Sequence, residues 1–239
     1  MVKISTGSYD LNKWLYGGYD SDIITTIYGG AGVGKTNFCM SVAVSQAKKD
    51  NKVIYIDTEG GFSVDRFKQI VSENAEDFLK NIILLKPTNF DEQYKAFGDL
   101  IKQLKNNKIS LIIVDGMTML YRLELAENKE DKNKVREINS LLARQMRMLA
   151  EIARRKEIPV IVTNQVYNEF LSDEDFKAGK QSGTRMVGGD ILKYWSKCII
   201  ELQQQGNKRK AILRKHRSLP EKEINFEIIN LGIKRRGWI

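Results

Sequence analysis

Cysteine, histidine and long apolar runs are scarce in this chain of 239 residues. Its two cysteines, Cys39 and Cys198, have no partners at the spacing of a metal site or a redox motif, and both fall in apolar segments, as buried reduced thiols do. The single histidine, His216, is expected to pack or to make a hydrogen bond rather than to bind metal. No apolar run is long enough to span a membrane, and the first residues contain no apolar core of a secretion signal. These absences predict a cytoplasmic protein without a membrane partner.

Internal repeats, low-complexity tracts and linkers are also absent, so we expect one α/β domain over residues 1–239. The formal net charge is +9 and the isoelectric point is about 9.4. A basic balance favours a polyanionic partner, although many proteins without one share it. The position of the charge along the chain is therefore more informative than its total.

The most informative stretch is a glycine-rich segment that follows an apolar, β-branched run and precedes a helical pattern. It reads G-x-x-x-x-G-K-T, the phosphate-binding P-loop, and comprises Gly29, Gly30, Ala31, Gly32, Val33, Gly34, Lys35 and Thr36, with Asn37 directly after. Such glycines let backbone N–H groups surround phosphate oxygens, and the helix directs its positive end at the same anion. Lys35 would neutralise the β- and γ-phosphates, and the hydroxyl of Thr36 would bind Mg²⁺. A glycine turn that binds nothing is the alternative, but the strand–turn–helix context favours ATP with Mg²⁺.

Apolar runs alternate with helical patterns along the first two thirds of the chain, which predicts a mostly parallel sheet flanked by helices. The expected strands are 23–28, 53–56, 82–85, 109–114 and 158–162. Later runs at 198–202, 210–215 and 224–229, with a turn at Gly206-Asn207, predict an antiparallel extension of the sheet. The charged segment 123–134 and the aperiodic segment 166–187 are expected to be loops.

Three polar residues stand just past the ends of expected parallel strands, where ligands bind in such sheets. Asp115 fits the Walker B position and would hold Mg²⁺ opposite Thr36. Glu59 would polarise the water that attacks the γ-phosphate, and Gln165 would sense that phosphate. Each also has an ordinary alternative as a residue that merely ends a strand or lies in a turn.

Several segments together resemble the RecA-fold recombinases, specifically the archaeal RadA group and its short paralogues. The resemblance runs from about residue 5 to residue 232 and rests on Ser5-Thr6-Gly7, Asp57-Thr58-Glu59-Gly60-Gly61-Phe62, Asp65-Arg66-Phe67, Leu120-Tyr121-Arg122, Thr163-Asn164-Gln165-Val166 and Lys215-His216-Arg217-Ser218-Leu219-Pro220-Glu221. It implies a RecA-like ATPase core, with Glu59 as the water-activating glutamate, Gln165 as the sensor and Arg66 over the adenine ring. It also implies that segments 123–134 and 166–187 face DNA and that segment 215–221 approaches a neighbouring subunit's nucleotide.

The chain departs from the RadA group in two respects. Its first residues already match the ATPase core, so neither an N-terminal helical DNA-binding domain nor a polymerisation segment is expected. Stable filaments and autonomous strand exchange are therefore not expected, and self-association should be weak at most. Segment 166–187 also retains little of the recombinase loop's sequence.

Lysine and arginine concentrate in two late clusters, one at 208–217 and one at Lys234-Arg235-Arg236. Such clusters neutralise nucleic-acid phosphates without reading sequence. The predicted DNA contacts are Lys208, Arg209, Lys210, Arg214, Lys215 and Arg217, with Lys177, Lys180 and Arg185 in the earlier segment. The alternatives are a solvated edge strand, or a finger in which Lys215 or Arg217 reaches a neighbour's γ-phosphate.

Three functions remain open from these residues. The favoured one is an ATP-binding paralogue that binds single-stranded or branched DNA and modulates a full-length RadA-type recombinase or other repair proteins, with weak or no ATP hydrolysis. The second is a DNA-dependent ATPase that performs strand exchange itself. The third is a KaiC-like RecA-fold ATPase without a DNA role, which would not account for the late basic cluster.

Overall fold

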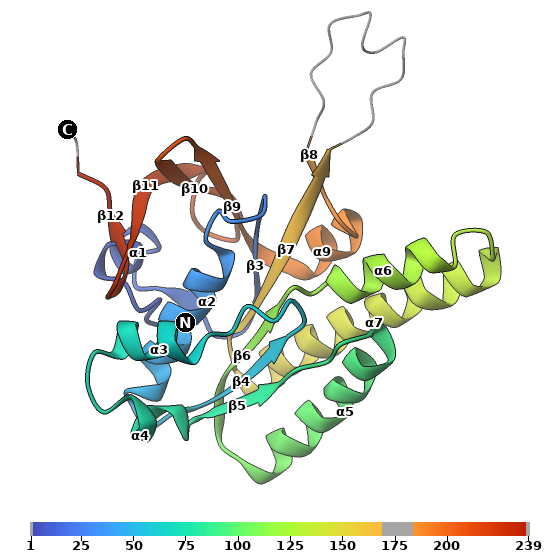
Figure 1. The fold of residues 1–239 in the computed structure, drawn as a ribbon, viewed down its shortest axis with the longest axis horizontal. Coiled ribbons are helices and arrows are strands. Elements are labelled where there is room, and N and C mark those ends of the chain that lie inside the picture. Colours follow the sequence, from blue (N-terminus) through green and yellow to red (C-terminus); the bar gives the residue numbers. More distant parts are fainter. Residues whose placement is uncertain (1, 169–183, 238–239) are drawn as a thin grey trace, which may run out of the picture.

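A ten-stranded sheet runs through the computed structural model, which describes residues 2–168 and 184–237. Along the sheet the strands follow the order β12-β11-β10-β9-β3-β7-β6-β4-β5, and β8 pairs with the end of β7. The strands β3 (Ile24–Gly29), β4 (Lys52–Asp57), β5 (Ile82–Leu85), β6 (Ile109–Asp115), β7 (Val160–Asn168) and β9 (Ser196–Gln205) are mutually parallel. The predicted, mostly parallel sheet is thereby confirmed (Figure 1).

The antiparallel extension is also confirmed and is longer than the sequence indicates. It consists of β10 (Lys208–His216), β11 (Lys222–Ile229) and β12 (Gly232–Arg235), and β8 (Thr184–Met186) is antiparallel to β7. Gly206, at a φ of 56°, lies in the turn between β9 and β10. This left-handed conformation suits glycine and places the turn where the sequence predicts it.

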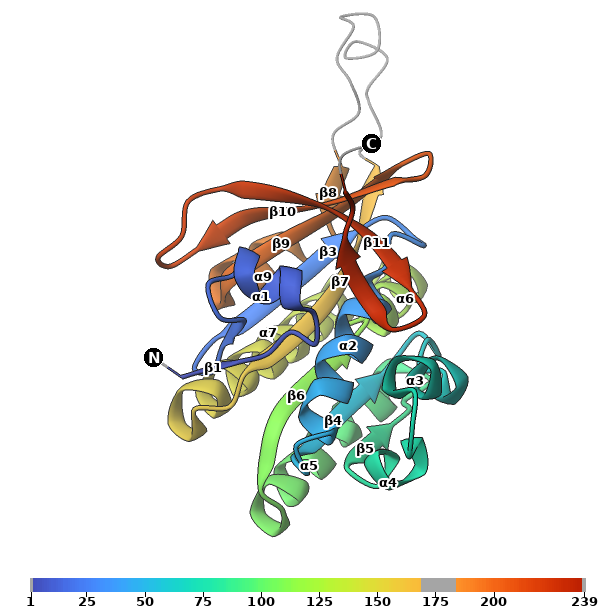
Figure 2. The same cartoon turned by 90° about the vertical axis from the view of Figure 1, so that its left-hand side faces the viewer.

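Helices cover both faces of the parallel strands, as Figure 2 shows with α1 and α2 before the sheet and α5 and α7 behind it. One face carries α1 (Tyr9–Trp14), α2 (Lys35–Ala47), α3 (Val64–Val71) and α4 (Ala75–Leu79); the other carries α5 (Phe90–Asn106), α6 (Met119–Glu127), α7 (Lys132–Lys156) and α9 (Gly189–Trp195). Successive strand residues serve opposite cores: Tyr55 packs in the first and Ile56 in the second. The strands are apolar on both faces for this reason.

Polar residues begin four of the helices by accepting backbone N–H groups that would otherwise lack partners. The side chains that do so are Ser8 for α1, Ser63 for α3, Asn89 for α5 and Asp131 for α7.

The expected loop at 123–134 is wrong. Helix α6 continues to Glu127, and α7 begins at Lys132 after a short link. Asp131 caps the second helix, and the charges lie on the outer surface of a helical hairpin that projects from the body of the molecule (Figure 1). A charged run is common on a solvated helix face, so charge alone was a poor indicator of a loop.

Segment 166–187 is only partly described. Strand β7 extends to Asn168, and β8 places the backbone of Arg185 beside it. Lys177 and Lys180, two of the predicted DNA contacts, lie outside the described residues. Three further features have no clear signal in the sequence: α4, β12, and the two-stranded sheet of β1 (Lys3–Ile4) and β2 (Tyr19–Asp20).

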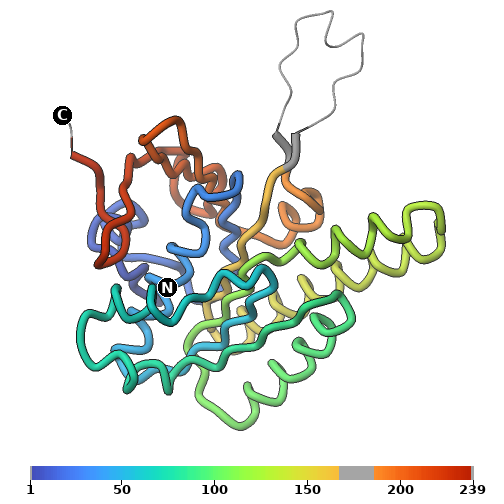
Figure 3. Tube along the Cα trace, viewed as in Figure 1, coloured from blue at the N-terminus to red at the C-terminus, as the bar shows by residue number. Residues whose placement is uncertain are grey.

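The N-terminal helix lies beside the last strands of the sheet. Figure 3 shows the N-terminal segment, in blue, beside the last strands, in red. The carboxylate of Asp10 on α1 accepts the backbone N–H of Arg235 on β12 at 2.8 Å. Helix α1 therefore packs against the antiparallel extension rather than only on the parallel strands.

Candidate nucleotide-binding site

The glycine-rich segment forms the turn between β3 and α2, as the sequence predicts. Gly34 caps α2 in the left-handed region, at a φ of 113°. A Cβ at this position would lie 2.9 Å from Cδ1 of Ile228, so the side chain of Ile228 on β11 would have to shift to admit one. The turn and the start of α2 thus combine exposed backbone N–H groups with a helix N-terminus, the arrangement that binds phosphate.

Lys35 folds back onto this turn. Its Nζ donates to the carbonyl oxygens of Gly29 at 3.0 Å and Gly30 at 2.7 Å, and the residue is only 7% exposed. Burial lowers the pKa of Lys35, while the negative charges of Glu59 and Asp115 oppose that change. The ammonium group is therefore held over the turn with only backbone partners, and phosphate oxygens are better partners for it.

Strand register brings the other strand ends to the same edge. Gly29 at the end of β3 is the register partner of Gln165 on β7, and Asp57 on β4 is the partner of Asp115 on β6. The carboxyl ends of adjacent parallel strands thus place these residues in one row. The expectation that Glu59, Asp115 and Gln165 gather near the P-loop agrees with this arrangement.

Asp115 lies in a network of hydroxyl groups. Its Oδ1 accepts from Thr163 at 2.6 Å, its Oδ2 accepts from Tyr55 at 2.7 Å, and Thr36 also hydrogen-bonds it. The residue is 2% exposed, and burial raises its pKa, although the three hydroxyl groups oppose that effect. A buried carboxylate without a cationic partner is costly, and a nearby cation would offset that cost.

The loop that carries Glu59 is shaped by Asp57. The carboxylate of Asp57 accepts the backbone N–H groups of Glu59 at 3.3 Å, Gly61 at 3.1 Å and Phe62 at 2.9 Å. The neighbouring Gly116 fits closely, because a Cβ there would lie 2.7 Å from Cγ of Glu59. Backbone hydrogen bonds to Asp57 therefore shape the loop, and the side chain of Glu59 lies close to Gly116.

Glu59 and Gln165 contact each other directly. Nε2 of Gln165 donates to Oε2 of Glu59 at 2.9 Å. Beyond Gln165, the side chain of Asn164 donates to the carbonyl of Val187 at 2.7 Å and also contacts Thr118. The amide of Val187 in turn donates to the carbonyl of Gln165 at 3.3 Å. Gln165 is thus connected to both ends of segment 166–187. It precedes residue 166 in the chain, and its carbonyl accepts from Val187.

Arg66 lies at the start of α3, next to the P-loop helix. Its guanidinium donates to Asn37 at 2.8 Å and to the carbonyls of Ile229 at 2.7 Å and Asn230 at 3.1 Å. These contacts use the N–H groups at the edge of the guanidinium. Stacking of its flat face on an adenine ring stays a prediction. They also join α2, α3 and the turn between β11 and β12.

The residues fit a nucleotide with Mg²⁺. Thr36 and Asp115 offer a hydroxyl and a carboxylate oxygen, the hard ligands that Mg²⁺ takes alongside phosphates and water. Within the described ranges no cluster of three or more His, Cys, Asp or Glu side chains could hold a metal ion by itself. When bound, Mg²⁺ would supply charge stabilisation at the phosphates.

Carboxylates neutralise much of the basic segment 208–217. Lys210 pairs with Glu223 at 3.0 Å. Arg214 bonds Glu201 and Glu221, both at 2.6 Å. Lys215 donates instead to the carbonyl of Lys193 at 2.8 Å, and Lys208 is exposed.

Arg217 and His216 both reach the N-terminal part of the chain. Arg217 contacts Asp20 at 3.1 Å and Asp22 at 2.7 Å, and Nε2 of His216 lies 3.5 Å from Asp20. Burial lowers the pKa of His216, against the raising effect of Asp20. His216 makes polar contacts, as expected. Contact of Arg217 with DNA stays a prediction. To bind a DNA phosphate, Arg217 would have to break its ion pairs with Asp20 and Asp22.

Sequence reasoning missed the residues that support the site. No role was predicted for Tyr55, Asp57 or Thr163, although each orders a predicted residue. Two signals were available: Tyr55 and Asp57 share one face of β4 at a spacing of two, and Thr163 is a polar residue inside an apolar run.

No helix in the part of the chain that the structure describes is long and apolar enough to cross a membrane.

Comparison with known proteins finds similar chains over nearly the whole length. The Rad51 family model matches residues 1–236. DNA repair and recombination protein RadB of Methanocaldococcus jannaschii is 40% identical over 224 residues, which cover 94% of this chain and 98% of the relative. RadB of Methanobrevibacter smithii is 39% identical over 236 residues, covering 97% and 95% of the two chains. A crystal structure of the RadB recombinase superposes with a TM-score of 0.77 at 31% identity, covering 98% of this chain and all of the other.

Proposed function

This chain belongs to the Rad51 family, and from that premise we propose that it binds ATP with Mg²⁺, binds DNA and acts in homologous recombination and DNA repair. We further propose that it modulates a full-length recombinase of the RadA type and hydrolyses ATP slowly or not at all. The relatives are described as DNA repair and recombination proteins, which supports the cellular role. The cytoplasm, as predicted from the sequence, is the proposed compartment.

One observation carries the proposal: the P-loop, Asp115, Glu59 and Gln165 meet at the carboxyl edge of adjacent strands. The P-loop and Asp115 supply the groups that bind a nucleotide and its metal. Gln165 contacts Glu59 on one side and is tied to Val187 on the other. A change at the γ-phosphate would therefore reach segment 166–187, which the family resemblance assigns to DNA.

Slow hydrolysis follows from the same contact. One carboxylate oxygen of Glu59 accepts from Gln165, which fixes the orientation of the carboxylate, and we propose that this is not the orientation that activates water. Binding of nucleotide or DNA would need to break this hydrogen bond before Glu59 could act. We therefore propose a nucleotide-gated switch in preference to a fast ATPase.

ATP turnover measured with and without single-stranded DNA, together with mass by light scattering, tests the proposal. The expected result is a low rate, nucleotide-dependent DNA binding that weakens steeply with salt, and no large assembly. Long helical filaments with ATP and single-stranded DNA, seen by electron microscopy, would instead favour direct strand exchange. Nucleotide binding without DNA binding at any salt concentration would favour the KaiC-like alternative.

The proposed partnership has its own test. A RadA-type recombinase immobilised on a sensor should retain this protein more strongly with ATP than with ADP. The Lys35→Ala variant should lose that difference, because it cannot read the nucleotide. Equal retention in every nucleotide state would contradict gating by ATP.

A further inference from the structure

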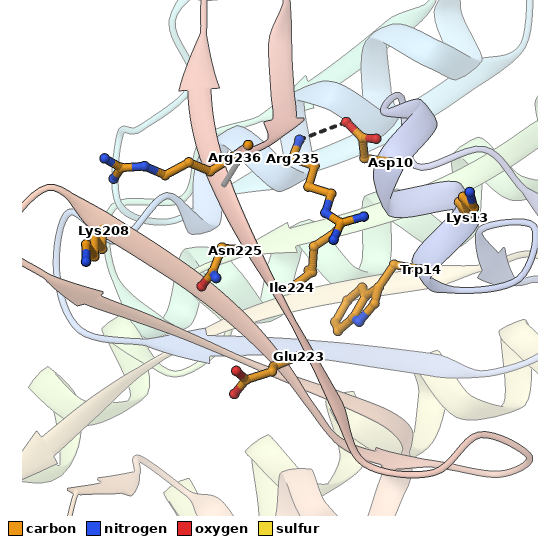
Figure 4. Close-up of a pocket in the computed structure, with 10 residues that line it drawn as sticks. Asp10, Lys13, Trp14, Lys208, Glu223, Ile224, Asn225, Arg235 and Arg236 are labelled. Atoms are coloured by element: carbon orange, nitrogen blue, oxygen red, sulfur yellow. Dashed lines mark hydrogen bonds between the residues drawn. The ribbon is translucent and has the colours of Figure 1, made fainter. Parts of the chain in front are cut away.

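A basic pocket lies between α1 and the strands β11 and β12, away from the P-loop turn. Its volume is about 560 Å³, within the range of sites for small ligands. Its lining includes four cationic side chains, Lys13, Lys208, Arg235 and Arg236, and two carboxylates, Asp10 and Glu223. Figure 4 shows these residues arriving from separate elements around one opening.

The two carboxylates do not neutralise the four cations. Asp10 accepts the backbone N–H of Arg235 at 2.8 Å, and Glu223 pairs with Lys210 at 3.0 Å. In the described ranges, none of the four cationic side chains forms a salt bridge; Arg236 donates to the carbonyl of Asn207 at 2.8 Å. This differs from Arg214 and Arg217 on the neighbouring basic segment, which are both paired with carboxylates. Uncompensated positive charge is thus present in the pocket.

Trp14 gives a second and independent indication of a ligand. Its side chain lines the pocket and the residue is 8% exposed, and its indole Nε1 is buried with no hydrogen-bond partner among the described residues. An indole N–H can only donate, and a buried donor without an acceptor is unfavourable. Figure 4 places the ring beside Ile224 at the boundary of α1 and β11. An acceptor oxygen that entered the pocket would satisfy this donor after a small side-chain adjustment.

We propose that the pocket binds the phosphate backbone of a single-stranded nucleic acid. Figure 4 places Lys208 and Lys13 on opposite sides of the pocket, with Arg235 and Arg236 between them, so successive phosphates can meet different cations. Guanidinium groups suit phosphate oxygens through paired N–H donors. Trp14 is buried and not available for stacking, so recognition would be independent of base sequence. The inference rests on the DNA-binding part of the proposed function and locates one contact surface for it.

Affinity for a fluorescein-labelled oligothymidylate, measured by anisotropy over a range of salt concentrations, tests this site. Lys13→Ala with Arg235→Ala should weaken binding by about fivefold or more and reduce the salt slope by roughly 1.4, since each single-strand phosphate contact contributes about 0.7. A matched control, Lys102→Ala with Lys105→Ala on α5, removes the same charge from the opposite face of the sheet and should change affinity less than about twofold. Trp14→Phe, which removes the N–H donor along with part of the ring but no charge, should weaken binding with an unchanged salt slope.

The outcomes separate the pocket from the proposed function. Wild-type affinity in the pocket variant, or an equal loss in the α5 control, would overturn the pocket and leave DNA binding elsewhere intact. Failure of the wild-type protein to bind the oligonucleotide at any salt concentration would overturn the DNA-binding part of the proposed function itself. If polyglutamate of equal length displaces the oligonucleotide equally well, the pocket binds acidic chains in general, and the nucleic-acid assignment is wrong. ATP affinity should be unchanged in all three variants, which shows that they are folded.

Discussion

The side-chain amide of Gln165 donates to the carboxylate of Glu59 across 2.9 Å, although the two residues are 106 positions apart in sequence. The contact joins the loop after β4 to the end of β7. It places the predicted sensor of the γ-phosphate on the predicted water-activating group. A movement of Gln165 therefore changes how the carboxylate of Glu59 is held.

Removal of this hydrogen bond should release Glu59. We expect Gln165→Ala to raise ATP turnover in the absence of DNA by about fivefold, the equivalent of one hydrogen bond of about 1 kcal/mol. The stimulation by single-stranded DNA should be lost at the same time. Gln203→Ala, which alters another exposed glutamine that bonds a glutamate, is the control for a steady-state phosphate-release assay. A variant with wild-type basal turnover and normal stimulation would contradict the coupling.

Lys35→Ala should weaken ATP binding by about 100-fold, because it removes charge-assisted hydrogen bonds to phosphate of about 1.5–3 kcal/mol. The stability of the nucleotide-free protein should change little, since Nζ bonds only the carbonyls of its own turn. Titration calorimetry and thermal unfolding measure the two effects. Lys48→Ala, at the other end of α2, should retain wild-type affinity; normal ATP affinity in Lys35→Ala would disprove the site.

Asp115→Asn should act in opposite directions on stability and on binding. Burial raises the pKa of Asp115 in the native protein above its ordinary value of 3.8, which applies to the unfolded chain. Between the unfolded and the native pKa, the native protein therefore binds more protons than the unfolded chain. The free energy of unfolding of the wild type therefore falls as pH rises through that window. Asparagine does not titrate, so Asp115→Asn does not lose this stability. Its Tm at neutral pH without nucleotide should equal or exceed that of the wild type.

The same variant should lose the gain in nucleotide affinity that Mg²⁺ provides, because a carboxylate oxygen leaves the proposed metal shell. Affinity measured with Mg²⁺ and with a chelator gives that gain directly. Asp50→Asn, on an exposed loop, is the matched control. An unchanged Mg²⁺ response in Asp115→Asn would exclude this residue from the metal shell.

Arg217→Ala should destabilise the protein by about 1–2 kcal/mol, since it leaves the buried carboxylate of Asp20 with fewer partners. The guanidinium is 24% exposed and bridges Asp20 and Asp22. A double-mutant cycle with Asp22→Ala, followed by denaturant unfolding, isolates the pairing. Lower DNA affinity without any loss of stability would instead support the phosphate contact predicted from the sequence.

The sequence by itself determined the local elements and the chemistry of each strand end. The P-loop, Asp115 and the buried strands follow from motif spacing and from apolar runs, which depend on near neighbours along the chain. The same local rules gave a wrong loop at 123–134, because a charged run is compatible with a solvated helix as well as with a turn. They also identified the basic clusters, but not which of their charges are compensated.

Only the tertiary structure decided which distant groups meet. Strand order and register set Gln165 beside Gly29, and Asp115 beside Asp57, across gaps of more than 50 residues. The packing of the N-terminal segment on the last strands pairs Arg217 with Asp20 and Asp22, and forms the pocket around Trp14. The physical reason is that hydrogen bonds and ion pairs act over a few ångströms in space. Sequence patterns describe only the neighbours along the chain, and the sheet topology chooses all the others.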